Sequence, residues 1–253
     1  MAVVGIGACF LVNSLTYLAM LAALIGMRSN ELAPAAAARK TTVHRQVREG
    51  LDYVRHAPDL LLPLLLMAAI ATFGYNFTVA LPLLARYALG VEAIEFGALT
   101  SAMGVGSLIG ALLAATLQQA TWRTILLGAS GFSFLLMAVA LSSHFWLTIG
   151  LLTVLGLFSI TFTTGINTTL QLSSEPEFRG RVMSLYVMIF GGSMPIGGLI
   201  TGALSERVGI QATLGIEAIA CALAIAVAAW LRHRWLLRAA SGRSTVGAPH
   251  AAG

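Results

Sequence analysis

The sequence contains very few charged residues. Only 10% of its 253 residues are charged, 58% are hydrophobic, and Lys40 is the only lysine. Soluble domains carry roughly 25% charged and 45–50% apolar residues. This shortage of charge excludes an ordinary soluble domain and is typical of a chain that lies in a bilayer.

Cysteines are also scarce, and histidines are absent from the middle of the apolar segments. Cys9 and Cys221 both fall inside apolar segments, which excludes a disulfide framework. The histidines lie at segment ends or in loops, and no Ser/His/Asp arrangement or phosphate-binding loop is visible. We therefore expect no metal site, no cofactor and no enzymatic activity.

Long apolar segments make up most of the chain. A helix that spans a bilayer needs roughly 20 apolar residues, and seven segments of about this length fit between the polar breaks. They do not alternate as barrel strands do, so the expected fold is an all-α membrane protein with about seven transmembrane helices. The segments are Ala2–Met27, Asp59–Arg86, Phe96–Leu117, Thr124–Leu141, Trp146–Leu172, Val182–Leu204 and Gln211–Leu231.

The one long polar interval, from Arg28 to Pro58, divides the chain. Within it Val47, Leu51 and Val54 recur at helical spacing among arginines, which predicts an amphipathic helix. This helix either lies at the membrane surface or is a solvated linker helix. The predicted organisation is a single transmembrane helix (1–27), a cytoplasmic central loop (28–58), a six-helix bundle (59–231) and a basic, disordered cytoplasmic tail (232–253).

The basic residues are distributed unequally between the two sides of this topology. Loops two, four and six hold only Arg86 and Arg207, whereas the other thirteen of the fifteen basic residues lie in loops one, three and five and the tail. Because cytoplasmic loops are enriched in Lys and Arg, we expect the N-terminus outside and the C-terminus in the cytoplasm. The same rule explains the net positive charge better than binding to nucleic acid does.

Small residues suggest close helix contacts and an internal repeat. Gly106 and Gly110 form a small-xxx-small pair that allows two helices to approach closely. Gly104 and Gly110 match Gly191 and Gly197 at an offset of 87 residues. An offset of three helices reverses membrane orientation, so the pattern predicts an inverted repeat, as in transporters. The glycines expected to pack helices are Gly106, Gly110, Gly191, Gly197 and Gly198.

The loop before the sixth segment resembles a known family. Residues 176–185 read Pro-Glu-Phe-Arg-Gly-Arg-Val-Met-Ser-Leu. This run is similar to the loop between helices ten and eleven of major facilitator superfamily transporters, in the efflux branch that includes the enterobactin exporter and related drug exporters. Residues 191–202 resemble that family's helix eleven, and residues 45–54 resemble the end of its central loop. The loop after the third segment, residues 118–123, departs from the family's Gly/Asp/Arg-rich motif.

The resemblance implies that the chain corresponds to helices six to twelve, with one half-bundle of two inverted three-helix repeats. It implies a proton-coupled exporter of a small amphipathic molecule, such as a drug or siderophore, in the bacterial inner membrane. The alternative is a truncated, transport-incompetent fragment or partner bundle that needs a separate N-terminal half. The expected partners are the bilayer, the substrate, and either that half or a second copy of the chain.

Two groups of residues are candidates for function. Polar residues on the segments that resemble cavity-lining helices seven and ten, together with Met188, form the candidate substrate cavity; interhelical hydrogen bonding is the alternative role for them. Arg179, Gly180 and Arg181 form a candidate conformational latch, which would hold one conformer through Glu175, Glu177 or a neighbouring loop; topology anchoring is the alternative. The cavity candidates are Tyr75, Asn76, Thr163, Thr164, Asn167 and Met188.

Glu217 is the ionisable residue that lies well inside a predicted span. Ionisable residues inside membranes are functional candidates, and proton coupling is one role for Glu217. The other role is a packing carboxyl that is hydrogen-bonded to a neighbouring helix or to water, and we expect this second role.

Overall fold

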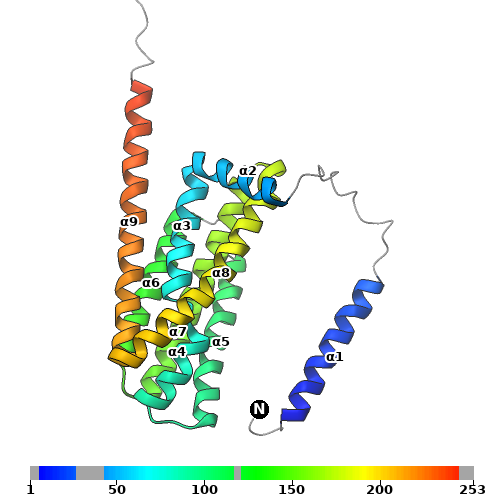
Figure 1. Cartoon of the computed structure of the whole chain (residues 1–253), viewed down its shortest axis with the longest axis vertical. Coiled ribbons are helices and arrows are strands. Elements are labelled where there is room, and N and C mark those ends of the chain that lie inside the picture. Colours follow the sequence, from blue (N-terminus) through cyan, green and yellow to red (C-terminus); the bar gives the residue numbers. More distant parts are fainter. Residues whose placement is uncertain (1–5, 27–42, 117–120, 245–253) are drawn as a thin grey trace, which may run out of the picture. The chain divides into compact units, whose positions relative to one another are not determined.

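The structure is a computed structural model that describes residues 6–26, 43–116 and 121–244, and the regular structure in these ranges is entirely helical (Figure 1). The chain divides into two compact units, residues 1–45 and residues 46–253. The first unit contains α1 (Ile6–Ile25), whose strongly apolar part is Phe10–Ile25. Residues 2–5 and 27 of the predicted first span lie outside the described residues.

The second unit contains six helical segments that are long and apolar enough to cross a membrane. The all-α membrane fold is therefore confirmed, with six such spans among the described residues of this unit; the seventh predicted span corresponds to α1, a 20-residue apolar helix of the first unit. The segments are formed by α3 (Pro58–Phe73), α4 (Phe77–Leu83) and the π-helical η2 (Leu84–Ala88) as one span, then α5 (Ala93–Thr116), α6 (Trp122–Leu141), α7 (Phe145–Ser173), α8 (Pro176–Val208) and α9 (Ile210–Ser244).

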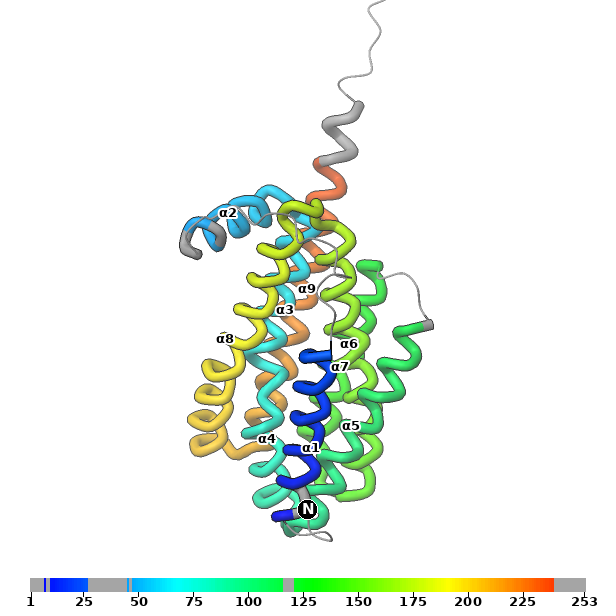
Figure 2. Tube along the Cα trace, turned by 90° about the vertical axis from the view of Figure 1, so that its right-hand side faces the viewer, coloured from blue at the N-terminus to red at the C-terminus, as the bar shows by residue number. Residues whose placement is uncertain are grey.

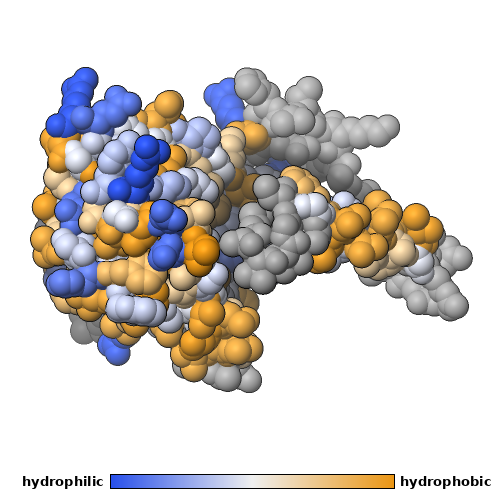
Figure 3. Space-filling model, turned by 90° about the horizontal axis from the view of Figure 1, so that it is seen from below, coloured by the Kyte–Doolittle hydropathy of each residue, from blue (hydrophilic) through white to orange (hydrophobic). Residues whose placement is uncertain are grey.

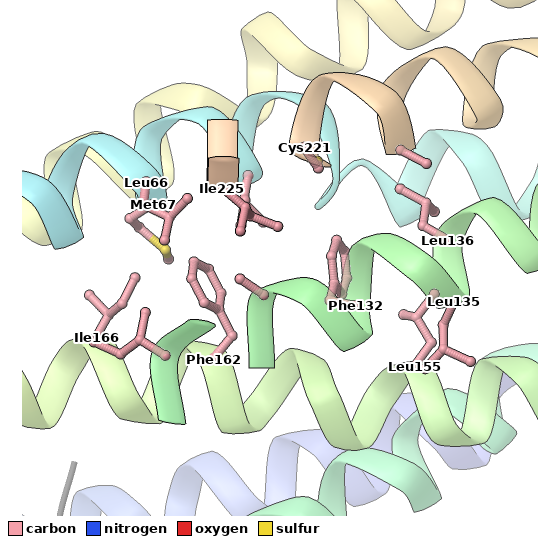
Figure 4. Close-up of a cluster of buried hydrophobic side chains, with 14 of the residues drawn as sticks. Leu66, Met67, Phe132, Leu135, Leu136, Leu155, Phe162, Ile166, Cys221 and Ile225 are labelled. Atoms are coloured by element: carbon pink, nitrogen blue, oxygen red, sulfur yellow. The ribbon is translucent and has the colours of Figure 1, made fainter. Parts of the chain in front are cut away.

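Successive helices of this unit run in alternating directions, and α7 packs against both α5 and α6 while α9 packs against α6 (Figures 1 and 2). Figure 4 shows the core of the bundle, where Met67 of α3 and Phe162 of α7 point towards one another and Phe132 of α6 lies further along the bundle. All three side chains are fully buried. Burying large apolar and aromatic side chains supplies the packing contacts that hold a helix bundle together.

The first span of the bundle is broken in its middle. α3 ends at Phe73 and α4 begins at Phe77, so Gly74, Tyr75 and Asn76 interrupt the helix. A side chain at Gly74 would lie 2.5 Å from the ring of Phe132, so this position accepts only glycine without repacking. Pro63 and Pro82 lie near the two ends of this span, where kinks are tolerated, and α3 passes through Pro63 without interruption. The break lies at mid-span, at the polar candidates Tyr75 and Asn76.

The amphipathic helix predicted in the central interval is α2 (Val43–His56). The two predicted locations, the membrane surface and a solvated linker, do not include the contact that the structure shows. The apolar side of α2 packs on the end of the bundle. Val54 is 1% exposed, Gly50 is buried, and Val47 and Tyr53 pack against the core. The basic residues Arg48 and Arg55 remain exposed. The helix hides its apolar face against protein, which satisfies the same amphipathic pattern that a membrane surface would.

α9 corrects the prediction of a disordered tail from residue 232. The helix continues from the membrane-spanning part to Ser244, so residues 232–244 are helical. Arg232 helps to hold the helix to the bundle, since its guanidinium lies 3.9 Å from Asp59 and 4.7 Å from the ring centre of Trp122. Residues 245–253 lie outside the described residues.

The described basic side chains gather at one end of the bundle. That end carries α2, the start of α6, the α7–α8 junction and the far end of α9 (Figure 1). Arg86 on η2 and Arg207 at the end of α8 lie at the other end, which Figure 3 shows as a mixture of hydrophilic and hydrophobic residues. This grouping follows the predicted loop assignment, while the orientation of the bundle in a membrane stays a prediction.

Candidate transport site

Tyr75 is tied to α7 by its hydroxyl and covered by aromatic rings. Its hydroxyl donates to the backbone oxygen of Ser159 at 2.9 Å and accepts from the Ser159 hydroxyl at 2.9 Å. Its ring stacks on Phe132 at 5.1 Å and meets Phe190 of α8 edge-on at 5.7 Å. These contacts fix the side chain of Tyr75 within the break in the first span and link it to α6, α7 and α8.

Asn76 is buried beside the same break, and only one end of its amide is satisfied. Its Nδ2 donates to the Thr72 backbone oxygen at 2.7 Å, while Oδ1 has no hydrogen-bond partner and the residue is 3% exposed. Gly197 of α8 lies directly against it, because a side chain at Gly197 would come within 2.4 Å of Oδ1. A buried amide oxygen without a partner is uncommon, which makes this place, where α8 meets the break, a candidate for function.

The α7 candidates form a polar strip around Ser159. Thr163 donates to the backbone oxygen of Ser159 at 3.1 Å, and Asn167 accepts a hydrogen bond from Gln171. Tyr186 of α8 stacks on Phe190, which meets Tyr75 edge-on. The structure therefore brings Tyr75, Asn76, Thr163 and Asn167 onto neighbouring helices around the break.

Two of the cavity candidates stand apart from these contacts. Thr164 is partly buried on α7, and Met188 is 54% exposed on α8, outside the buried cluster. Sequence reasoning missed Ser159, which connects Tyr75 with Thr163, and Tyr186, which stacks on Phe190 beside them. Their spacing could have indicated them, since Ser159 lies four residues before Thr163 on the same face of α7.

Glu217 lies in the interior of the hairpin formed by α8 and α9. Gly209, with φ of +82°, is the only residue between the two helices. Thr201 and Glu217 lie the same number of residues before and after it along the chain. Glu217 is 2% exposed, and its Oε1 lies 2.5 Å from the Thr201 hydroxyl. The Thr201 hydroxyl also lies 2.9 Å from the backbone oxygen of Gly197. The expected hydrogen bond to a neighbouring helix is thus present, with Thr201 as the partner that sequence reasoning had not identified.

At the opposite end of the bundle, Arg181 forms an ion pair with Glu49 of α2 at 3.1 Å and lies 5.1 Å from the ring centre of Phe178. Among the latch candidates, Arg181 thus pairs with a residue of another element, and that residue is Glu49 of α2 rather than Glu175 or Glu177. Arg179 is exposed.

Aromatic and backbone contacts also hold α2 against the α7–α8 junction. The ring of Tyr53 stacks on Phe178 at 4.3 Å, nearly parallel, and its hydroxyl accepts a hydrogen bond from the backbone N–H of Glu175 at 3.2 Å. Gly50 allows the close approach, since a side chain there would lie 3.2 Å from Cβ of Arg181. We call this set, Glu49, Gly50, Tyr53, Phe178 and Arg181, the α2 contact.

The packing glycines differ in what surrounds them. A side chain at Gly106 would overlap the Thr153 backbone oxygen at 1.7 Å, and one at Gly110 would lie 2.4 Å from Ile160, so α5 and α7 touch at these two positions. Gly198 makes only ordinary contact with Val79. Gly191 differs from the prediction, because a side chain there would meet nothing within 4 Å.

No group of three or more metal-binding side chains occurs in the part of the chain that the structure describes. The polar residues named above are mostly uncharged, and the one buried carboxyl among them is Glu217. Such an arrangement can hold a neutral or amphipathic molecule by hydrogen bonds and aromatic contact, and it can hold a proton.

Comparisons with known proteins agree with this architecture. A family model described as a transmembrane secretion effector, MFS_3, matches residues 1–247. Macrolide efflux protein A of Streptococcus pyogenes is 29% identical over 173 residues, which cover 66% of this chain and 42% of that protein. The Enterococcus faecalis protein of the same name is 30% identical over 159 residues, or 60% of this chain and 49% of that protein. The matches thus span less than half the length of these curated relatives. No solved structure matches the chain.

Proposed function

Because this multi-pass membrane chain belongs to the transmembrane secretion effector family of the major facilitator superfamily, we propose that it forms the C-terminal half of a secondary active exporter. The observation that carries the proposal is the unit of six alternating spans with a polar, broken first span, preceded by α1 and a basic interval. The residue run at 176–185, at the start of α8, supports placing these spans at helices seven to twelve of the family.

The proposed half-bundle needs a second body to complete a cavity. In the strongly apolar parts of α8 and α5, only 11% and 22% of the residues are buried, compared with 56% in the first span of the bundle. Facilitator-type carriers place substrate near the midplane between two halves that move against each other. A separate N-terminal half is the proposed partner, and a second copy of this chain is the alternative partner.

The proposed substrate is a small amphipathic molecule such as a drug or a siderophore. Hydroxyl and amide groups beside the rings of Tyr75, Tyr186 and Phe190 suit a molecule with both polar and apolar surfaces. The name of the relatives, macrolide efflux protein, supports export of a drug. Export, proton coupling and location in a bacterial inner membrane, with the N-terminus outside and the C-terminus in the cytoplasm, belong to the same proposal.

The proposal assigns the α2 contact the role of the conformational latch. Arg181 holds α2 against the α7–α8 junction, at the end of the bundle where the central interval enters. A movement of α8 against α2 would break the ion pair and the stack together, so the contact favours the conformer in which it is formed. The exposed Arg179 suits membrane anchoring better.

The experiment is transport by the purified chain in proteoliposomes, with and without a separately made fragment of family helices one to five. A fluorescent amphipathic drug serves as the substrate. We expect gradient-dependent transport only with both fragments, and less of it when Tyr75 is changed to Leu. Its control is Tyr87→Leu, because Tyr87 is exposed on η2, away from the buried cluster.

Two results would argue against this assignment. Transport by the chain alone would indicate a homodimeric carrier. Absence of transport with both fragments, although they assemble, would indicate the transport-incompetent partner bundle considered from the sequence.

A further inference from the structure

The hydroxyl of Thr201 lies between two acceptors although it has one hydrogen to give. It is 2.9 Å from the Gly197 backbone oxygen and 2.5 Å from Glu217 Oε1. A hydroxyl donates one hydrogen bond and accepts others. If Glu217 is ionised, Thr201 must share its one hydrogen between the two acceptors; if Glu217 carries a proton and donates it to Thr201, Thr201 can give its own hydrogen fully to Gly197, and both contacts become two-centre hydrogen bonds.

The surroundings of Glu217 also favour the protonated form. The residue is 2% exposed, and none of the ion pairs among the described residues includes it. An ionised carboxylate that is buried without a counter-charge is very costly. A protonated carboxyl in the same place costs no more than other hydrogen-bonded polar groups.

The ionisable groups on the elements packed against Glu217 do not supply a counter-charge. The buried ones are Cys221, one turn along α9, and Tyr75 at the helix break, and both are uncharged when protonated. Those on η2 and the end of α8 are exposed: Arg86, Tyr87, Glu206 and Arg207. The charged residues Asp59 of α3 and Arg123 of α6 lie at the opposite end of the bundle. Ser133 of α6 donates to the Ala218 backbone oxygen at 2.8 Å and carries no charge.

We propose that Glu217 is a proton-binding site, held in its protonated form by the hydrogen-bonded chain from Glu217 through Thr201 to Gly197. When the proton leaves to water, the carboxylate must accept a hydrogen bond, and the hydrogen of Thr201 turns from Gly197 towards Glu217. Gly197 is the residue that lies against Asn76 at the break. Loss of the proton therefore alters α8 at its contact with the candidate cavity. The coupling of this step to export rests on the proposed function.

Infrared spectroscopy of the whole chain in lipid vesicles at neutral pH tests the protonation directly. A protonated carboxyl gives a carbonyl band that a carboxylate lacks. We expect the band in the unchanged chain, its loss in Glu217→Gln, and its retention in Glu206→Gln, which alters an exposed carboxyl near the same hairpin turn. The amide of Gln can still donate to Thr201, so the variant is expected to fold.

Changes at Thr201 test the hydrogen-bonded chain. Thr201→Val removes the acceptor and should shift the band of Glu217, whereas Thr201→Ser keeps a hydroxyl and should leave the band in place. The absence of any protonated carboxyl band in the unchanged chain would overturn the proposal. A band that survives Glu217→Gln would overturn it as well.

Transport by the two assembled fragments tests the coupling. We expect Glu217→Gln to lose efflux driven by a proton gradient and to keep substrate binding, and Glu206→Gln to keep both. Full proton-driven efflux by Glu217→Gln would refute the coupling role. Failure of the unchanged fragments to transport would count against the proposed function alone, because the infrared result does not require transport.

Discussion

Glycines two residues apart on α5 have very different surroundings. Gly106 lies against the α7 backbone, whereas a side chain at Gly104 would meet nothing within 4 Å. We predict that Gly106→Ala destabilises the bundle by about 1–3 kcal/mol, since a methyl group there forces two backbones apart. The measurement is the denaturant dependence of helix content in detergent.

Gly104→Ala is the matched control for this prediction. It lies on the same helix and adds the same methyl group to open space, so it should be neutral or stabilising by up to about 1 kcal/mol, the helix-propensity difference between Ala and Gly. Equal destabilisation by both changes would mean that the α5–α7 contact is not what makes Gly106 necessary.

The glycines paired by the predicted repeat can be compared by what surrounds them in the structure. Gly104 and Gly191, which are 87 residues apart, both face open space, while Gly110 and Gly197 both lie in tight contacts with another helix. Matching residues of the two proposed repeats thus have matching environments. The sequence pattern could suggest the pairs but could not say which glycine of each repeat touches a neighbour, because that depends on contacts between distant segments.

At the scale of elements, the α2 contact gives a quantitative prediction. The side chains of Glu49 and Arg181 are 34% and 25% exposed, so their ion pair is partly screened by solvent. We predict a coupling free energy of about 0.5–1 kcal/mol in a double-mutant cycle with Glu49→Gln and Arg181→Ala, measured by unfolding. Salt should weaken it.

Two further variants separate the parts of this contact. Arg181→Lys keeps the charge but loses the planar guanidinium that lies over Phe178, so we expect it to recover only part of the coupling. Arg179→Ala, at an exposed position in the same segment, should leave the α2 contact unchanged. A coupling energy of zero together with unchanged transport would leave anchoring as the role of Arg181.

Periodicity and length predicted the helices of this unit well, but they did not predict what the helices touch. The apolar face of α2 was evident from Val47 and Val54, yet the choice of protein over membrane as its partner depends on Tyr53 meeting Phe178, far along the chain. The break at Gly74 was not predicted, although the Gly-Tyr-Asn run at this place consists of weak helix formers. Composition predicted a disordered tail from residue 232. It could not show that Arg232 lies over the ring of Trp122 and holds the first part of this tail against the bundle.

At the scale of the whole molecule, the prediction concerns which end of the bundle faces the cytoplasm. Arg48 lies on α2, and His144 precedes α7 at the opposite end of the bundle. We predict that a cysteine at position 48 faces the cytoplasm and one at position 144 faces outside, after Cys9 and Cys221 have been replaced by Ala. Labelling of intact cells with a membrane-impermeant thiol reagent should modify position 144 only.

Positions 55 and 92 serve as a second pair on the same two sides, since Arg55 belongs to α2 and Glu92 precedes α5. Modification of positions 48 and 55 in intact cells, with positions 92 and 144 protected, would reverse the orientation. The infrared test of Glu217 would be unaffected by that outcome.

The single residue between α8 and α9 also fixes the rotational phase of the two helices. One residue inserted into α9 between Gly209 and Glu217, and taken up as helix, would turn Glu217 by about 100° around the α9 axis relative to Thr201 and shift it by about 1.5 Å. Glu217 would then point away from Thr201. Four inserted residues would bring it back to within about 40° but displace it by about 6 Å. Proton binding at this hairpin should therefore be lost and partly regained with the helical period as residues are inserted. It should not fall steadily with the number of inserted residues.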